Sequence, residues 1–404
     1  MERINIAQVK IGDINIEKLS LFLDEDKNLI VLPFLWSLHM CNVGSVYKWK
    51  KVGSYSKFQT KKPSSSQQFL ENSSISDNTI RNYLGHIFKF LEYIDKSNKE
   101  SETPSVHRTE LLNSAFINNY LNNVLPESLS STNSLNAHQA AINSYTNFLF
   151  EMEIRDVIPI TIYRTTKQKM AETNTRLKKI NYVSKSERAQ LLKACNNHRG
   201  KLILRLGYEV GLRTSELCGL LLRKSDEKQH PSRKGLLSLF FELKNKPTQM
   251  SFQYLLDGKF TKRGKSRYIY FSRELLEDMK QYFENERLII EKQSGLIKDS
   301  FFLRIDPKGF GLPIGKKQGT NTFADLIKLF PHMNETLSYH DLRHTFATEL
   351  YHLELLDAEG QETRSESAAL IAVSERLGHA DTKTTQKYIR LRMQMLMIEG
   401  VNHD

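Results

Sequence analysis

The chain has 404 residues, which is long for one ordinary domain and favours two. Its 39% hydrophobic and 26% charged residues are typical of a protein that buries hydrophobic cores. No apolar run is long enough to cross a bilayer, and the first residues lack the apolar segment of a secretion signal, so we expect neither membrane insertion nor export. The three cysteines are too few and too far apart for a disulfide framework or a zinc site, which favours a reducing cytosol.

The formal net charge of +12 restricts the classes of partner. A strongly basic chain binds nucleic acid, an acidic protein or an anionic lipid surface. Charge alone does not choose among these three partners, so the choice rests on individual motifs.

Residues 1–72 are interpreted as an N-terminal extension with a possible β-hairpin. Two apolar stretches within residues 12–33 flank the polar turn Asp24–Asn28, a pattern typical of a small hairpin. Residues 57–74 are polar and rich in serine, so we expect them to be weakly ordered. The sequence leaves the role of this extension open.

Residues 73–160 are predicted to form a compact helical domain. Apolar residues recur at three- and four-residue steps from residue 80 to residue 94, as on one face of a helix. Two more helices are expected, over 109–125, where Pro126 would end the helix, and over 134–153. Arg81 is one of several cations expected on the surface of this domain and is a candidate DNA contact, although a solvated face is the simpler interpretation of any one of them.

Residues 161–183 are interpreted as a basic linker between domains, because they are polar and have no clean apolar period. Among their cations are Lys167 and Lys169. Such a linker can lie along phosphates, since each contact releases counterions, or it can simply keep the chain soluble. Both interpretations stay open.

Residues 184–404 are predicted to form a second domain, mainly helical with a small antiparallel β-sheet. Ser184 and Glu187 make a capping-box pattern that opens a helix. A further helix is expected to end at Gly211, and another to start after it. The segments 236–243 and 267–271 are β-like, and a polar turn precedes the second segment.

The second domain contains a set of residues that metal-free cleavage of a phosphodiester requires. Arginine forks can clamp the non-bridging oxygens, a histidine can add a third donor, and a tyrosine can supply the nucleophile. A lysine suits the general acid, and a second histidine can accept the tyrosine proton. The members of the set are Arg213, Lys262, His340, Arg343, His379 and Tyr388.

Each member taken alone has a more ordinary explanation. A lone arginine is most often a surface or capping residue, and a lone tyrosine is far more often packed than nucleophilic. The Gly378–His379 pair can be only the end of a helix, and His340 can be a satisfied structural histidine. Only the whole set, in its order along the chain, indicates this chemistry.

The set resembles the tyrosine recombinase (phage integrase-like) family of site-specific DNA recombinases. The family pattern is an arginine in G-L-R-x-S-E-L, a lysine in a hairpin, H-x-L-R-H, then L-G-H and a tyrosine about nine residues later. Every position is filled in this chain, by the residues Arg213, Lys262, His340, Arg343, His379 and Tyr388. The match covers residue 184 to the end, and the helical domain before it resembles the core-binding domain of the family by architecture.

The resemblance implies a two-domain clamp on double-stranded DNA and cleavage through a 3′-phosphotyrosyl intermediate at Tyr388. Because the phosphotyrosyl bond conserves the bond energy, neither ATP nor a metal cofactor is expected. Glu216 would orient the catalytic arginines, and Lys265 and Arg267 would contact phosphates beside Lys262, which is preferred over Lys265 as the catalytic lysine. A cytoplasmic, nucleoid-associated enzyme for integration or excision of a mobile element is the expected biological setting.

The resemblance also implies a homo-tetramer on two DNA sites, with possible accessory proteins that bend the DNA. The Met-rich segment after Tyr388 would then dock on a neighbouring protomer, although it can equally pack on its own domain. Two pieces, 227–259 and 358–366, are longer than the family pattern leads one to expect.

Two other functions are weighed against recombination. A type IB topoisomerase would use the same chemistry without strand exchange between duplexes. A DNA-binding protein with a degenerate site would lack a catalytic residue, and none is missing here.

Overall fold

We describe the chain from a computed structural model, which describes residues 1–51, 68–99, 109–173, 181–225, 227, 229–357, 360–378 and 386–400. The chain divides into two units, Met1–Leu177 and Lys178–Asp404, which are treated separately below. The expected fold class is confirmed, because the described elements are mostly helices with three small two-stranded antiparallel sheets. Among the described helices, none is both long and apolar enough to cross a bilayer.

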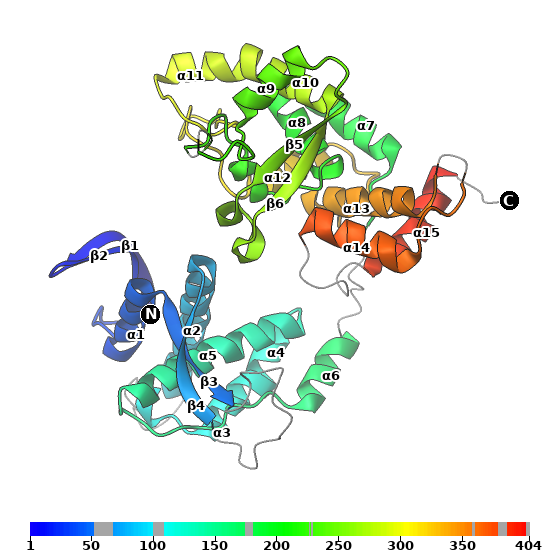
Figure 1. Ribbon diagram of the computed structural model, residues 1–404. Coiled ribbons are helices and arrows are strands. Elements are labelled where there is room, and N and C mark those ends of the chain that lie inside the picture. The colour runs from blue at the N-terminus through cyan, green and yellow to red at the C-terminus, as the bar shows by residue number, and fades with distance from the viewer. Residues whose placement is uncertain are drawn as a thin grey trace, which may run out of the picture. The chain divides into compact units, whose positions relative to one another are not determined.

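The first unit begins with two β-hairpins separated by a helix (Figure 1). Strand β1 (Glu2–Ile11) pairs with β2 (Ile14–Leu23), and β3 (Ser45–Lys51) pairs with β4 (Gln68–Ser74). Helix α1 (Val31–Val43) lies between them in sequence and packs on β2.

A β-hairpin was expected in this extension and is present, but it does not form at the expected turn. The first hairpin turns at Gly12, whose φ of +59° suits a tight turn, and the Asp24–Asn28 turn instead leads from β2 into α1. The segment 57–74 was expected to be weakly ordered throughout, but residues 68–74 are strand β4, whereas 57–67 lie outside the described residues.

The helices of the first unit pack around one core. They are α2 (Asp77–Lys99), α3 (Ser114–Asn119), α4 (Leu125–Ser128), α5 (Thr132–Glu151) and α6 (Arg164–Thr173). Helices α2 and α5 pack against each other, and Trp36, Phe90 and Tyr145 are fully buried in this core. Pro126 was expected to end a helix, but it lies in the first turn of α4, where the missing N–H is tolerated.

The second unit is a helical body that carries one hairpin. Strand β5 (Ser251–Leu256) pairs with β6 (Arg267–Ser272) in antiparallel register, with Phe252 opposite Phe271. The helices are α7 (Lys185–Ala194), α8 (His198–Tyr208), α9 (Leu236–Asn245), α10 (Arg273–Tyr282), α11 (Leu288–Ser294), α12 (Gln318–Ile327), α13 (Tyr339–Leu355), α14 (Glu366–Leu377) and α15 (Lys387–Glu399).

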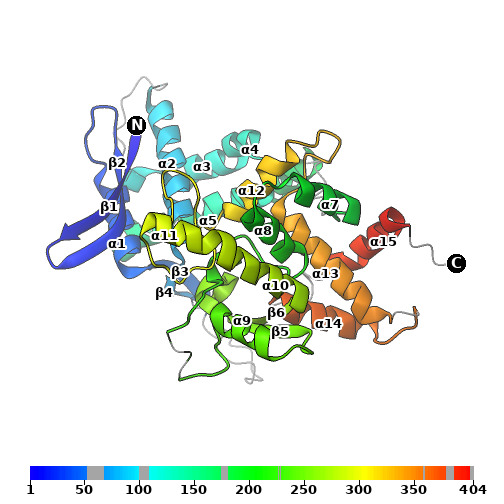
Figure 2. The same ribbon diagram turned by 90° about the horizontal axis from the view of Figure 1, so that it is seen from above.

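Helix α13 is the centre of this unit. It packs against α8, α12, α14 and α15, and both views show α14 and α15 beside it (Figures 1 and 2). The expected capping box at Ser184 is confirmed at the start of α7. The prediction of a strand over 236–243 was wrong, because this segment forms α9. A helix was also expected after Arg213, but only a short 3₁₀ turn, Glu216–Gly219, forms there.

Candidate active site

The first turns of α13 carry most of the polar groups of the site. A capping box between Ser338 and Asp341 starts the helix, with the Ser338 N–H donating to the Asp341 carboxylate at 2.9 Å. Arg343 and His344 follow one turn later and are 1% and 5% exposed. Side chains buried where this helix packs against its neighbours have no water to bind, so their polar groups must find partners inside the protein.

Glu216 is the buried anion that holds the arginines of the site. Its side chain is fully buried, and its carboxylate accepts from Arg213 Nη1 at 2.7 Å, from Arg267 Nη2 at 2.8 Å and from Arg343 Nη1 at 3.4 Å. Burial opposes ionisation, but Arg267, Arg343 and Arg213 outweigh it and lower the pKa of Glu216. The carboxylate is therefore charged at neutral pH and fixes three guanidinium groups at one point.

Arg343 is further tied to the backbone on both sides. Its Nη1 donates to the Gly211 carbonyl and its Nη2 donates to the Leu377 carbonyl at 2.6 Å. Gly211 has a φ of +71°, and a Cβ there would stand 2.4 Å from the Phe346 ring, so only glycine fits. The guanidinium of Arg343 is thus oriented by two helix ends that are distant in the sequence.

Arg213 and Arg267 differ in what they can still bind. Arg213 is half-buried, and after its bond to Glu216 its Nη2 keeps donors with no hydrogen bond among the described residues. Arg267 is 8% exposed and donates to Glu216 and to the Arg376 carbonyl. Two of its nitrogens are thus occupied inside the protein, whereas its buried Nε has no partner among the described residues, and the expected phosphate contact of Arg267 stays a prediction.

Tyr388 lies in the first turn of α15 and is fully buried. Its hydroxyl is 3.2 Å from Nδ1 of His344. Burial raises the pKa of Tyr388 to about 12, although Arg343 and Arg213 pull it down. The hydroxyl is therefore protonated at neutral pH, and its proton must leave before the oxygen can attack.

Lys387, the neighbour of Tyr388, extends the contact. Its Nζ is 3.4 Å from Nε2 of His344. Burial and the charges of Arg343 and Arg213 lower the pKa of Lys387 to about 8, while Asp341 opposes this shift. Tyr388, His344 and Lys387 thus form a chain in which one imidazole contacts both a phenol and an amine.

His340 lies beside this chain without joining it. Its ring centroid is 4.4 Å from that of His344, and no hydrogen bond between His340 and Tyr388 is found among the described residues. Desolvation and the charges of Arg343 and Lys387 lower the pKa of His340 to about 4, although its side chain is exposed. The imidazole is neutral at pH 7 and open to a ligand.

The other residues named from the sequence lie elsewhere. Lys262 and Lys265 are exposed on the turn between β5 and β6, and β6 is held at the site through Arg267 and Glu216. His379 lies outside the described residues. Arg81, Lys167 and Lys169 belong to the first unit, where all three are exposed, the first on α2 and the others on α6.

Sequence reasoning missed His344 and Lys387. His344 was part of the H-x-L-R-H motif, and its spacing of four from His340 places both on one helix face, so this signal was available. Lys387 has no periodic or motif signal, because only the fold of α15 against α13 brings it to the imidazole.

These groups are what phosphodiester cleavage by a tyrosine requires: a phenol with a proton acceptor beside it, and guanidinium donors preorganised by a buried carboxylate. Within the described residues, no group of three or more His, Cys, Asp or Glu side chains is placed to hold a metal ion.

Comparison with known proteins identifies the family. The model of the phage integrase family matches residues 181–395, more than half of the chain. The tyrosine recombinase XerD of Oceanobacillus iheyensis is 26% identical over 328 residues, 78% of this chain and 88% of that protein. Transposase A from transposon Tn554 of Staphylococcus aureus is 28% identical over 218 residues, 54% of this chain and 50% of that protein.

Among solved structures, the XerH site-specific recombinase bound to palindromic difH substrate, in a post-cleavage complex, is similar in fold. Its TM-score is 0.52 at 18% identity, over 80% of this chain and 78% of that chain. The chain belongs to the phage integrase family. It is a tyrosine recombinase, an enzyme that breaks and rejoins DNA strands, as the motifs predicted.

Proposed function

We propose that the protein recombines double-stranded DNA at specific sites by joining Tyr388 covalently to a 3′-phosphate, in the integration or excision of a mobile element. The observation that carries this proposal is the contact between the Tyr388 hydroxyl and His344, at 3.2 Å, beside the arginines held by Glu216. The names of two relatives support the biological setting, since one is a transposon transposase and the other a recombinase bound to its DNA site.

Each group has a role in the proposed reaction. Tyr388 attacks the phosphorus and gives its proton to a histidine, either His344, which contacts its hydroxyl, or His340, the expected acceptor. Arg213 and Arg343 bind the non-bridging oxygens, with His379 as a further donor. Lys262 protonates the departing 5′ oxygen from the exposed turn, with Lys265 beside it. Glu216 positions the arginines through its hydrogen bonds.

The proposed domain organisation follows the sequence expectation. Residues 1–72 are the extension, 73–160 the core-binding domain, 161–183 the linker and 184–404 the catalytic domain. The division of the chain between Leu177 and Lys178 supports this, because it falls inside the proposed linker. The linker, however, also contains helix α6, whose Thr166 and Met170 are buried one turn apart.

The proposed assembly is a homo-tetramer on two DNA sites, acting in the cytoplasm on the nucleoid, with DNA-bending partners where the site requires them. Lys167 and Lys169 on α6 are proposed to contact the DNA backbone. The exposed basic side chains and the net charge of +12 support binding to duplex DNA.

The first test is covalent trapping. A nicked suicide duplex that carries the DNA flanking the gene is incubated with the wild-type protein and with Tyr388→Phe, in a buffer with a metal chelator. The wild type is expected to form an adduct that survives denaturation, and Tyr388→Phe is expected to form none, a loss of at least about 10³-fold.

The controls separate chemistry from binding. Tyr388→Phe must bind the same duplex as tightly as the wild type in a gel-shift assay, since the lost hydroxyl is buried. If the mutant forms the adduct, Tyr388 is not the nucleophile. If the wild type binds the duplex but forms no adduct, the protein is a DNA-binding factor without strand cleavage.

A further inference from the structure

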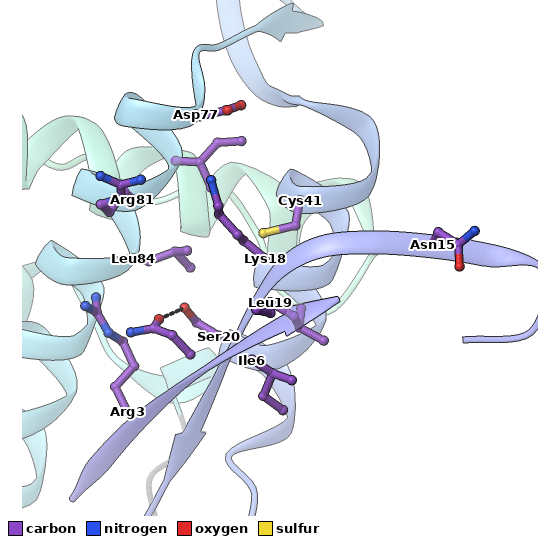
Figure 3. Close-up of a pocket in the computed structure, with 13 residues that line it drawn as sticks. Arg3, Ile6, Asn15, Lys18, Leu19, Ser20, Cys41, Asp77, Arg81 and Leu84 are labelled. Carbon is purple, nitrogen blue, oxygen red and sulfur yellow. Dashed lines mark hydrogen bonds between the residues drawn. The ribbon is translucent and has the colours of Figure 1, made fainter. Parts of the chain in front are cut away.

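A cavity of about 440 Å³ lies in the first unit between the β1–β2 hairpin and helix α2 (Figure 3). Arg3 and Lys18 come from the hairpin and Arg81 comes from α2. The volume falls in the range of small-ligand sites. The cavity is formed by the N-terminal extension and by the helix that follows it. None of the catalytic residues proposed above lines it.

The charged groups around this cavity are unbalanced. Three cationic side chains line it against one carboxylate, that of Asp77 at the start of α2. Two of the three cations are guanidinium groups, whose planar forks match the oxygens of a phosphate or a carboxylate. A site with this excess of positive charge attracts an anion.

Arg3 supplies the second, independent observation. Its Nη1 is buried without a hydrogen-bond partner in the described part of the chain, and a buried unpaired donor is costly. The guanidinium packs 5.9 Å from the centroid of the Phe88 ring, and Nη1 is 3.4 Å from where a Cβ on Gly85 would stand. The guanidinium is thus held against α2, and no described protein group satisfies its Nη1.

Part of the remaining lining is apolar, beside the polar side chains of Asn5, Asn15 and Ser20. Four large aliphatic side chains contribute to the wall, and three of them are at least nine-tenths buried. They are Ile6, Leu19, Ile80 and Leu84. Cations beside an apolar wall fit a phosphate attached to a sugar, because the oxygens bind the cations and the ring carbons contact the aliphatic groups.

We infer that this cavity binds a sugar phosphate, and that the hairpin of the extension thereby adds a phosphate contact to the DNA interface. The inference deepens the proposed function and rests on it, because DNA at the recombination site supplies such groups. The same chemistry has a second source, a free nucleotide, and the experiment distinguishes the two.

The test compares Arg3→Gln, Lys18→Gln and Arg81→Gln with the wild type in the full-length protein. The matched control is Lys10→Gln, an exposed lysine on β1 that does not line the cavity. Binding of a labelled duplex is measured by fluorescence anisotropy over a range of salt. Each lining variant is expected to bind about fivefold more weakly near physiological salt and to reduce the slope of log K against log salt by about 1, with no change for Lys10→Gln.

A variant of the same cavity that binds the duplex more tightly would show that the weaker binding of the other variants is not caused by misfolding. Asp77→Asn removes the single carboxylate that repels a phosphate at this site, so it is expected to tighten duplex binding about two- to fivefold. A second arm measures thermal unfolding of each protein with thymidine monophosphate or inorganic phosphate. Stabilisation of the wild type that the lining variants lose, at unchanged DNA affinity, identifies a free phosphate ligand instead of the DNA backbone.

Unchanged salt slopes together with no stabilisation by either phosphate overturn the inference. Failure of the proposed function gives a different result, since it is read from the covalent adduct on the suicide duplex. If the wild type forms no adduct, the proposed function fails, but the comparison of duplex binding by anisotropy can still be made.

Discussion

At the scale of single residues, the contacts of His344 decide where the proton of Tyr388 goes. An imidazole carries one proton when neutral, so its two nitrogens cannot both accept. If the Lys387 ammonium donates to Nε2, then Nδ1 bears the hydrogen and donates to the Tyr388 oxygen. In that tautomer His344 stabilises a phenolate but does not accept the phenol proton.

Loss of the Lys387 proton reverses these roles. Its pKa is lowered to about 8, so the amine becomes neutral as the pH rises through that value, and Nε2 can then carry the hydrogen while Nδ1 accepts. A bound phosphate opposes this loss and moves it above pH 8. Single-turnover adduct formation is therefore expected to rise about tenfold or more between pH 7 and pH 9.5.

The matching variant is Lys387→Met, which has no ammonium group to donate to Nε2 of His344. Its rate of adduct formation should therefore change less between pH 7 and pH 9.5 than the wild-type rate. Arg390→Met removes one exposed charge from the same helix and serves as the control, with the wild-type profile expected. Rates are measured by quenched-flow trapping at saturating DNA. A wild-type profile in Lys387→Met refutes the proton path through His344.

At the scale of elements, helix α15 controls whether Tyr388 can reach DNA. The tyrosine is fully buried, so attack on a phosphodiester requires α15 to shift. The far end of the helix is tied down: Glu399 accepts from the Lys185 N–H at 2.9 Å. The Tyr182 hydroxyl lies 3.2 Å from the same carboxylate and shares its one hydrogen with Glu349, at 2.8 Å. These bonds connect the end of the nucleophile helix to the segment that enters the catalytic domain.

Breaking this connection should release the helix. Glu399→Ala removes the hydrogen bond from the Lys185 N–H and the weaker contact with the Tyr182 hydroxyl, and is expected to loosen α15 by about 1–2 kcal/mol. Adduct formation at saturating DNA should then speed up about 5- to 30-fold, and amide exchange in α15 should accelerate. Glu375→Ala, on the exposed side of α14, is the control. Slower cleavage with unchanged DNA affinity would instead mean that the bonds hold Tyr388 in its reactive position.

The motifs named arginines that the structure brings together at Glu216, whereas an apolar run misled the prediction of one element. Segment 236–243 was interpreted as a strand because it is almost wholly apolar, yet Leu236, Leu239, Phe240 and Leu243 are buried at helical spacing and Phe241 is 68% exposed. The true strand β5 alternates exposed and buried residues, a period of two that was readable but overlooked.

Long-range packing explains what no local pattern predicts. Helix α6 buries only Thr166 and Met170, too few positions for a clear period, so its sequence resembles a linker. The burial of Arg267 depends on Glu216, which lies 51 residues earlier, and a local K-x-x-K-x-R pattern cannot reveal that partner. Such contacts are set by the tertiary fold.

At the scale of the whole molecule, the last helix presents apolar side chains to solvent. Met393 is 54% exposed, Met397 is 80% exposed and Ile398 is 47% exposed, while Leu391 and Met395 pack on the helix's own domain. The segment therefore packs in its own domain and still keeps an apolar outer side. Exposed methionines adapt well to a partner groove, which supports the proposed tetramer.

Met397→Glu tests this assembly. Burying a methionine at an interface contributes about 1.5–3 kcal/mol, so replacing it with a charge should weaken tetramer formation at least tenfold. Gln394→Glu adds the same charge at an exposed neighbouring position on α15 and is the matched control. Complexes with duplexes carrying one site are weighed by mass photometry, and recombination between two duplexes is scored on gels.

The expected result separates assembly from chemistry. Met397→Glu should bind one site and form the covalent adduct on a suicide duplex, because Tyr388 and the groups around it are unchanged. It should fail to pair two duplexes and to exchange strands, whereas Gln394→Glu should do both. Normal pairing by Met397→Glu would place the contacts between protomers elsewhere than the outer side of α15, and loss of the adduct on a single duplex would show that this side of the helix also supports cleavage within one protomer.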